Sequence, residues 1–120
     1  MEHQAENFHQ QIRDIIPFLK EARVNVFKKE LILKKIFYIE LVKAKDDGER
    51  SYNAQKAKAE STDEYYKASL DVAVAKSEYD SCQAKMKAAD MEFEEWRTKM
   101  ANLRSCLLYT SDAADDVYGV

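Results

Sequence analysis

The stretch from Tyr65 to Leu103 decides the fold, and it reads YYKASLDVAVAKSEYDSCQAKMKAADMEFEEWRTKMANL. Alternating steps of three and four residues along this stretch meet twelve apolar or aromatic side chains without interruption: Tyr65, Ala68, Val72, Ala75, Tyr79, Cys82, Met86, Ala89, Phe93, Trp96, Met100 and Leu103. Such spacing is typical of one seam of a helix that packs lengthwise on another helix. One heptad position holds mostly small residues, which allow two backbones to approach closely. We therefore predict an all-α fold, a long antiparallel helical hairpin of coiled-coil type.

The composition agrees with long helices. Of the 120 residues, 34% are charged, and only two are glycine and one is proline. This pattern is typical of coiled coils and unlike that of sheet proteins. The sequence has no run of eighteen apolar residues that would predict a membrane span, and its first residues lack the pattern of a secretory signal. Two cysteines without a motif are typical of a reducing compartment. We expect one cytoplasmic domain, in the host cytoplasm if the protein is phage-encoded.

A second apolar pattern marks the first half of the chain. It steps by four and three residues through Phe8, Ile12, Ile15, Leu19, Ala22 and Val26. Pro17 lies inside this pattern and could either open a new helix or kink a continuous one. We expect a short N-terminal helix that ends near Ile16. From Phe18 to Asp47 no residue breaks a helix.

Two places could reverse the chain. Gly48 follows two aspartates and offers a helix stop, whereas Ser61 and Glu64 have the spacing of a capping box just before the seam. A turn at 60–62 divides the chain into arms of similar length, 18–59 and 62–104. We favour this turn, with Gly48 tolerated inside the first arm. A turn at 46–48 is the alternative, and one unbroken helix is the third possibility.

The last fifteen residues differ from the rest of the chain. Lysine and arginine stop at Arg104, and residues 106–116 read CLLYTSDAADD. This run resembles the read-through translation of a transposon-type sequencing adapter. The resemblance implies that the natural protein is seen only up to about Ser105. We therefore expect a helical domain at 1–105 and an adapter-derived tail at 106–120.

The sequence contains no pattern of catalytic or metal-binding residues. The only histidines are His3 and His9, and neither glycine lies in a phosphate-binding loop. Cys82 has no histidine near it in sequence that could activate a nucleophile. We expect no enzymatic activity, no metal, no cofactor and no small-molecule substrate.

The clearest electrostatic feature lies between Lys20 and Lys45, where eight basic residues stand against three acidic ones. On a helical wheel six of the basic residues fall within about 140° of one another. They are Lys20, Arg23, Lys28, Lys34, Lys35 and Lys45. The same face carries Phe27, Leu31, Tyr38 and Val42, while the opposite face carries the hairpin stripe of Leu19, Ala22, Val26, Leu33, Phe37 and Leu41.

This basic and apolar face has three interpretations. Its four apolar residues could form an oligomer interface while the lysines extend to water. The cations could instead contact the phosphates of single-stranded DNA, with Tyr38 or Phe27 stacking on bases. The third interpretation is an anionic membrane surface, with apolar residues at the lipid interface. In each case we expect a homo-oligomer, because one hairpin cannot cover both faces of the first arm.

The segments YNAQKAKA at 52–59, YYKA at 65–68 and WRTKMANLRS at 96–105 carry a resemblance. Residues 50–105 resemble small phage and prokaryotic helical proteins, some of which are similar to phage recombination mediators that load a recombinase onto single-stranded DNA. The resemblance implies an accessory role in recombination or replication, with single-stranded DNA or a protein as partner. The long Lys/Glu-rich helices also resemble those of BAR-type membrane-curving proteins, although these have three long helices. A purely structural oligomerisation module is the further alternative. No binding residue follows from either resemblance.

Overall fold

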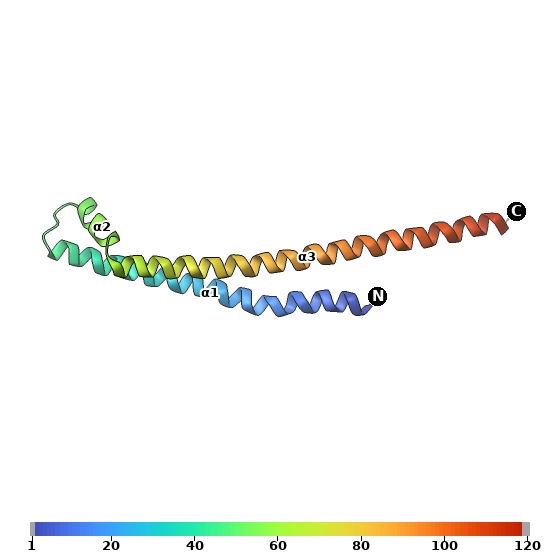
Figure 1. Ribbon diagram of the computed structural model, residues 1–120, viewed down its shortest axis with the longest axis horizontal. Coiled ribbons are helices and arrows are strands. Elements are labelled where there is room, and N and C mark those ends of the chain that lie inside the picture. The colour runs from blue at the N-terminus through green and yellow to red at the C-terminus, as the bar shows by residue number, and fades with distance from the viewer. Residues whose placement is uncertain (1, 119–120) are drawn as a thin grey trace. The chain divides into compact units, whose positions relative to one another are not determined.

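A computed structural model describes the backbone of residues 2–118 and the side chains of residues 4–107. The chain forms three helices, α1 (Glu2–Asp46), α2 (Tyr52–Glu60) and α3 (Asp63–Tyr118), as Figure 1 shows. No strand occurs in the described backbone, so the all-α prediction is confirmed. Contacts divide the chain into two units, Ile15–Ala84 and Met1–Asp14 with Lys85–Val120.

In the unit Ile15–Ala84, α1 and α3 run antiparallel. The rings of Phe37 and Tyr65 lie 6.2 Å apart between centroids. Further along, the Lys76 ammonium lies 3.6 Å from the Glu30 carboxylate. Residues of α1 with lower numbers thus contact residues of α3 with higher numbers, as in an antiparallel pair.

In the unit of Met1–Asp14 and Lys85–Val120, α1 and α3 also run antiparallel. The Trp96 indole N–H donates to the Gln4 side-chain oxygen at 2.7 Å. The rings of Phe8 and Phe93 lie 5.9 Å apart in an edge-to-face arrangement. The predicted antiparallel pairing of two long helices therefore holds within each unit.

The predicted seam of α3 is the shielded side of this helix. Eleven of its twelve residues are buried or half-buried, and only Leu103, at 44% exposure, is exposed. The alanines of the seam are the most deeply covered, with Ala68 4%, Ala75 2% and Ala89 6% exposed. Small side chains at these positions let the α1 backbone approach α3 closely.

The expected short N-terminal helix is not a separate element. Pro17 lies inside α1, which continues from Glu2 to Asp46. A proline within a helix removes one backbone hydrogen bond, the one that the Arg13 carbonyl would accept. Both Arg13 and Pro17 are exposed, so water can reach this carbonyl. The prediction of a break near Ile16 was wrong because the cost of one lost bond does not end a helix whose apolar stripe continues.

The first arm ends earlier than the favoured prediction of 59. α1 stops at Asp46, and Gly48 has a φ of +100° in the left-handed region. The Gly48 N–H donates to the Lys45 carbonyl and the Glu49 N–H to the Ala44 carbonyl, each at 3.1 Å. These are the two hydrogen bonds of a Schellman motif, which closes the C-terminus of a helix.

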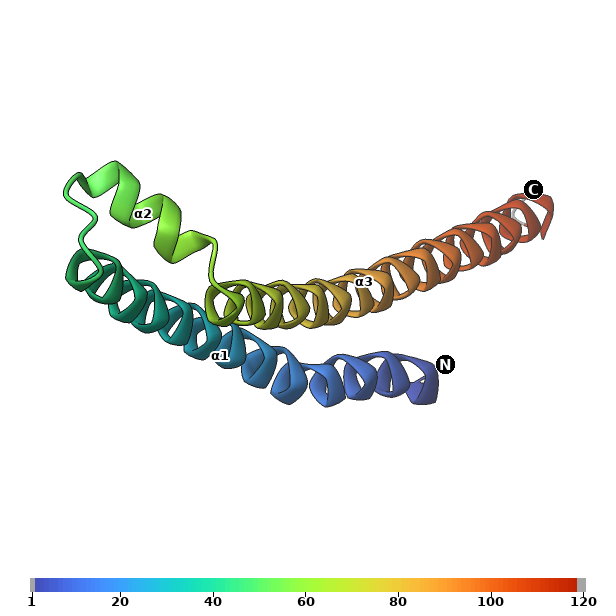
Figure 2. The same cartoon turned by 60° about the vertical axis from the view of Figure 1, so that its left-hand side comes forward.

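The chain already reverses before α2, as Figure 2 shows, because α2 runs back from the end of α1 toward the start of α3. The Ser51 hydroxyl accepts from the Ala54 N–H at 3.1 Å and caps the N-terminus of α2. The Gln55 amide donates to the Glu49 carbonyl at 2.8 Å, and Ala59 is fully buried. The reversal at 60–62 was therefore wrong, and the alternative at 46–48 places the end of α1 correctly.

The capping residue of α3 is also shifted by one position. The Thr62 hydroxyl, not that of Ser61, accepts from a backbone N–H of α3, that of Tyr65 at 3.2 Å. Ser61 instead donates to the Lys58 carbonyl at 2.8 Å, at the end of α2. The backbone of α3 continues through residues 106–118. The side chains from 108 onward are not described, so the predicted adapter-derived tail at 106–120 lies largely outside the described residues.

Candidate functional site

The outer face of α1 is the surface of this helix that carries the six cations of the sequence prediction. All six are exposed, and all lie in the unit Ile15–Ala84. None of them forms an ion pair with any residue from 4 to 107. Their positive charge is therefore available to a ligand. The residues are Lys20, Arg23, Lys28, Lys34, Lys35 and Lys45.

The acids of the same stretch point elsewhere. At 100° per residue, Glu21, Glu30 and Glu40 all fall outside the arc that holds the six cations. Glu30 pairs with Lys76 of α3, and Glu40 is buried at 8% exposure, with its carboxylate 3.3 Å from the Lys43 ammonium. Every charged residue inside the arc is therefore a cation, and Glu21 and Glu30 flank the arc about 20° beyond its two edges.

The four apolar residues of the sequence prediction are exposed on this face. Phe27 is 55%, Leu31 66%, Tyr38 54% and Val42 58% exposed. Sequence reasoning missed five more large apolar side chains of α1 that are exposed, namely Ile16, Phe18, Val24, Ile32 and Ile39. Val24 lies inside the arc of the cations, and Ile39 and Ile32 lie about 20° and 40° beyond its edge. Nine of the twelve residues from 31 to 42 are apolar, which indicates a helix with an unusually wide apolar face but not which of its side chains stay exposed. The outer face of α1 is therefore more apolar than the prediction had it.

A shallow, open hollow lies along one edge of the outer face of α1. Its lining comes from this helix alone: Lys35, Tyr38, Ile39, Val42 and Lys43. The Tyr38 ring contacts the Phe37 ring edge-to-face, with centroids 5.6 Å apart, and Phe37 in turn contacts Tyr65 of α3. The lining thus combines one aromatic ring and two lysines, with no carboxylate among its residues.

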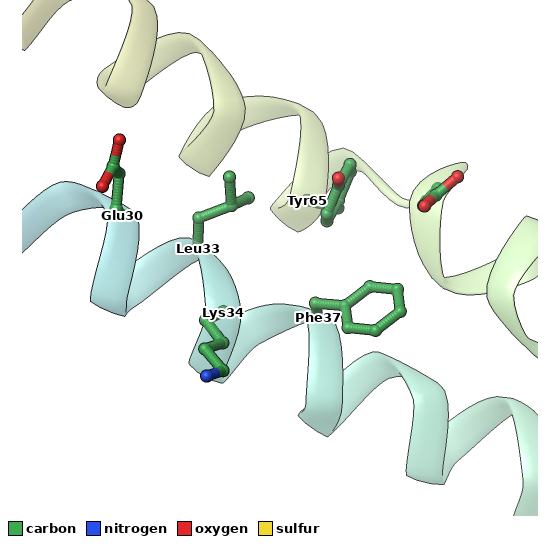
Figure 3. A pocket seen from close by; sticks show the side chains of 6 residues that line it. Glu30, Leu33, Lys34, Phe37 and Tyr65 are labelled. Carbon is green, nitrogen blue, oxygen red and sulfur yellow. The ribbon is translucent and has the colours of Figure 1, made fainter. Parts of the chain in front are cut away.

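A second hollow lies between the helices of the same unit. It measures about 260 Å³ and is lined by Glu30, Leu33, Lys34, Phe37, Glu60 and Tyr65. Figure 3 shows that Leu33 and Glu30 point toward α3, whereas Lys34 points away from it. Two carboxylates and apolar walls make this hollow part of the helix contact, with no feature of a catalytic centre.

The unit of Met1–Asp14 and Lys85–Val120 contains an aromatic cluster, of which the sequence predicted only the seam residues Phe93 and Trp96 and the stripe residue Phe8. The Phe93 and Trp96 rings stack at 6.0 Å, and the His9 ring lies 5.1 Å from Phe93. His9 thus packs against the seam. Within the described residues, no three His, Cys, Asp or Glu side chains come together in a way that could hold a metal ion.

The comparisons with known proteins gave no relative. No family model, no curated protein and no solved structure matches this chain. In the described part of the chain, no helix combines the length and the apolar character needed to cross a bilayer.

Proposed function

We propose that this chain is a non-enzymatic accessory protein that holds single-stranded DNA on the outer face of α1. The observation that carries the proposal is the set of six exposed cations, without ion pairs to residues 4–107, on a face that also presents large apolar and aromatic side chains. Proteins that bind single strands combine cations for the phosphates with rings for the bases. Residues 50–105 resemble small phage and prokaryotic helical proteins, some of which are similar to phage recombination mediators, and on this ground we propose a role in recombination or replication.

The length of the face suits a short single strand. Lys20 and Lys45 lie 25 residues apart on one helix, which corresponds to about 38 Å at ~1.5 Å per residue. Even at the ~3.4 Å per nucleotide of one strand in a duplex, which is less than in an extended single strand, about eleven nucleotides cover this distance, so eleven is an upper bound. A 20-nucleotide oligomer is therefore long enough to occupy the whole face.

The test is binding of a 20-nucleotide single strand at several salt concentrations, measured by fluorescence anisotropy. Three or four phosphate contacts predict that log K falls with log salt concentration at a slope of about −2 to −3. The double variant Lys34→Glu/Lys35→Glu should abolish binding at moderate salt, because it places two negative charges in the centre of the face. Circular dichroism should show unchanged helix content.

The matched control is Lys85→Glu/Lys87→Glu, which makes the same charge change at two exposed positions of α3. This control should retain most of the affinity of the unaltered protein. Equal losses in the two double variants would show that net charge, and not the outer face of α1, governs binding. Absence of binding by the unaltered protein at low salt, with residues 106–120 removed, would contradict the proposed function.

An anionic membrane surface is the second candidate. The exposed Val24, Ile32 and Ile39 favour it, since they widen the apolar part of the face beyond the predicted residues. Amphipathic helices with basic rims bind at the interface of anionic bilayers. In that case vesicles with anionic lipid should retain the protein, and Phe27→Ala/Leu31→Ala should weaken retention as strongly as charge reversal does.

A further inference from the structure

We propose that the hollow at Tyr38 is a nucleobase subsite, in which one unstacked base lies on the Tyr38 ring while Lys35 and Lys43 meet the flanking phosphates. This inference rests on the proposed function, and it assigns a position and a ligand group within the outer face of α1. It also selects Tyr38 over Phe27 as the stacking ring, a choice that the sequence left open.

The lining of the hollow fits an unstacked base. Tyr38, Ile39 and Val42 provide an apolar floor, and each of them is between 44% and 58% exposed. Lys35 and Lys43 lie at the two ends, eight residues and therefore about 12 Å apart along the helix axis. No acid lines the hollow itself, although the Glu40 carboxylate, 3.3 Å from the Lys43 ammonium, offsets part of the positive charge at one edge. The chemistry of the site is complementary to a planar ring on an anionic backbone.

One of the two ammonium groups has an ion-pair partner. The Lys43 ammonium lies 3.3 Å from the carboxylate of Glu40, whose side chain is 9% exposed. The Lys43 side chain is 64% exposed, and such exposed pairs are weak, so Lys43 can exchange this contact for one with a phosphate. Lys35 has no ion-pair partner among residues 4–107 and is free to follow a phosphate at the other edge.

The Tyr38 ring is supported from behind by a series of aromatic contacts. Phe37 touches Tyr38 with ring centroids 5.6 Å apart and an interplanar angle of 65°. Phe37 also touches Tyr65 of α3 at 6.2 Å and is only half-exposed. Within the described residues Phe27 has no such ring contact. Because a restricted side chain loses less entropy on binding, Tyr38 is the better stacking platform.

A base can reach this subsite only from an unpaired strand. In a duplex each base is stacked between its neighbours and paired, and extracting it costs a few kcal/mol. We therefore expect the subsite to favour single strands over duplexes, and to tolerate any base, since every base has a face that can stack.

The test compares oligo-dT with an abasic oligonucleotide of equal length, which has the same phosphates and no bases. The unaltered protein should bind oligo-dT more tightly. The variant Tyr38→Leu should lose about 5- to 150-fold in affinity for oligo-dT, the range for one base stacked on an aromatic ring. Its affinity for the abasic strand and its salt dependence should not change, because no charge is altered.

Two further variants complete the design. Tyr38→Phe keeps the ring and should bind oligo-dT within about twofold of the unaltered protein, because stacking needs no hydroxyl. Phe27→Leu, the matched control on the same face, should change the oligo-dT affinity much less than Tyr38→Leu does. An equal loss in Phe27→Leu and Tyr38→Leu would overturn the choice of Tyr38.

The outcomes separate the subsite from the proposed function. If the unaltered protein binds oligo-dT and the abasic strand equally, the subsite is wrong while the proposed function stands, and this result needs no variant that must fold. If the protein binds neither strand, both are wrong. If Tyr38→Leu loses binding to phosphatidylserine vesicles while oligo-dT affinity is unchanged, the hollow contacts lipid and the nucleobase assignment is overturned.

Discussion

Thr62 lies where α2 ends and α3 begins, and its hydroxyl group serves both helices. It accepts the Tyr65 N–H at 3.2 Å and donates to the Ala59 carbonyl at 2.9 Å. We predict that Thr62→Ala lowers the free energy of unfolding by about 0.5–2 kcal/mol, the usual range for an N-cap residue. Urea unfolding followed by circular dichroism measures this difference.

Ser61→Ala is the control for this prediction. Ser61 is exposed, and its hydroxyl makes one hydrogen bond, to the Lys58 carbonyl, that water can replace. We expect a change within about 0.5 kcal/mol, as for most surface substitutions. A larger loss in Ser61→Ala than in Thr62→Ala would show that the capping box begins at Ser61, as the sequence alone had suggested.

Gly48 shows how a single residue decides where α1 ends. Its φ of +100° is strained for any residue with a side chain, and no atom lies within 4 Å of the position that a Cβ would occupy. The requirement for glycine here is therefore one of backbone conformation and not of space. The sequence contained this signal, but it competed with a second one at Ser61, and local propensity alone could not rank the two.

At the scale of the helices, the small residues of the seam set how closely α1 approaches α3. Ala75 is 2% exposed and belongs to the unit Ile15–Ala84. We predict that Ala75→Leu lowers the free energy of unfolding by about 1–3 kcal/mol, because a larger side chain forces the two helices apart. Thermal and urea unfolding, monitored by helix content, measure this loss.

Ala73→Leu is the matched control, since Ala73 is exposed on the same turn of α3. Because Leu and Ala have similar helix propensities, we expect a change within about 0.5 kcal/mol. If both variants lose the same stability, α3 does not pack on α1 through the predicted seam.

The seam could be predicted from the sequence because its period extends over twelve positions, from Tyr65 to Leu103. Over so many positions, one residue that departs from the pattern does not hide the helical period. The separate helix α2 could not be predicted, because its nine residues are too few to show a period. What stabilises it is tertiary, the burial of Ala59 and the hydrogen bond from Gln55 to Glu49.

The candidate site likewise has one part that the sequence predicted and one that it did not. The six cations were found from the sequence because a charged residue on a helix is identified by its angle alone. The hollow at Tyr38 was not, since it depends on the side-chain positions of Ile39 and Lys43. Neither residue stood out in the pattern, because Ile39 lies within a long apolar run and Lys43 falls outside the arc of the six cations.

At the scale of the whole molecule, the chain has a net charge of −3. The charged residues within the arc of the outer face of α1, between Lys20 and Lys45, are nevertheless all cations. A second copy that docked symmetrically on this face would bring like charges together. Its exposed apolar residues nevertheless favour association, as large uncovered patches generally do. Salt changes the balance between the two effects, because it screens the repulsion between exposed charges and leaves the gain from apolar burial intact.

We therefore predict that the free protein self-associates at high micromolar concentration, and more strongly as salt rises, whereas binding of single-stranded DNA weakens over the same range. Light scattering gives the mass at each salt concentration. Leu31→Glu/Tyr38→Glu should lower that mass toward the monomer, because the variant places two carboxylates within the apolar residues of the face. The control Tyr66→Glu/Leu70→Glu changes two exposed residues of α3 and should leave the mass unchanged. A monomer at every salt concentration would show that the outer face of α1 needs no second copy, and a mass that falls as salt rises would show that ion pairs, not apolar contacts, hold the copies together.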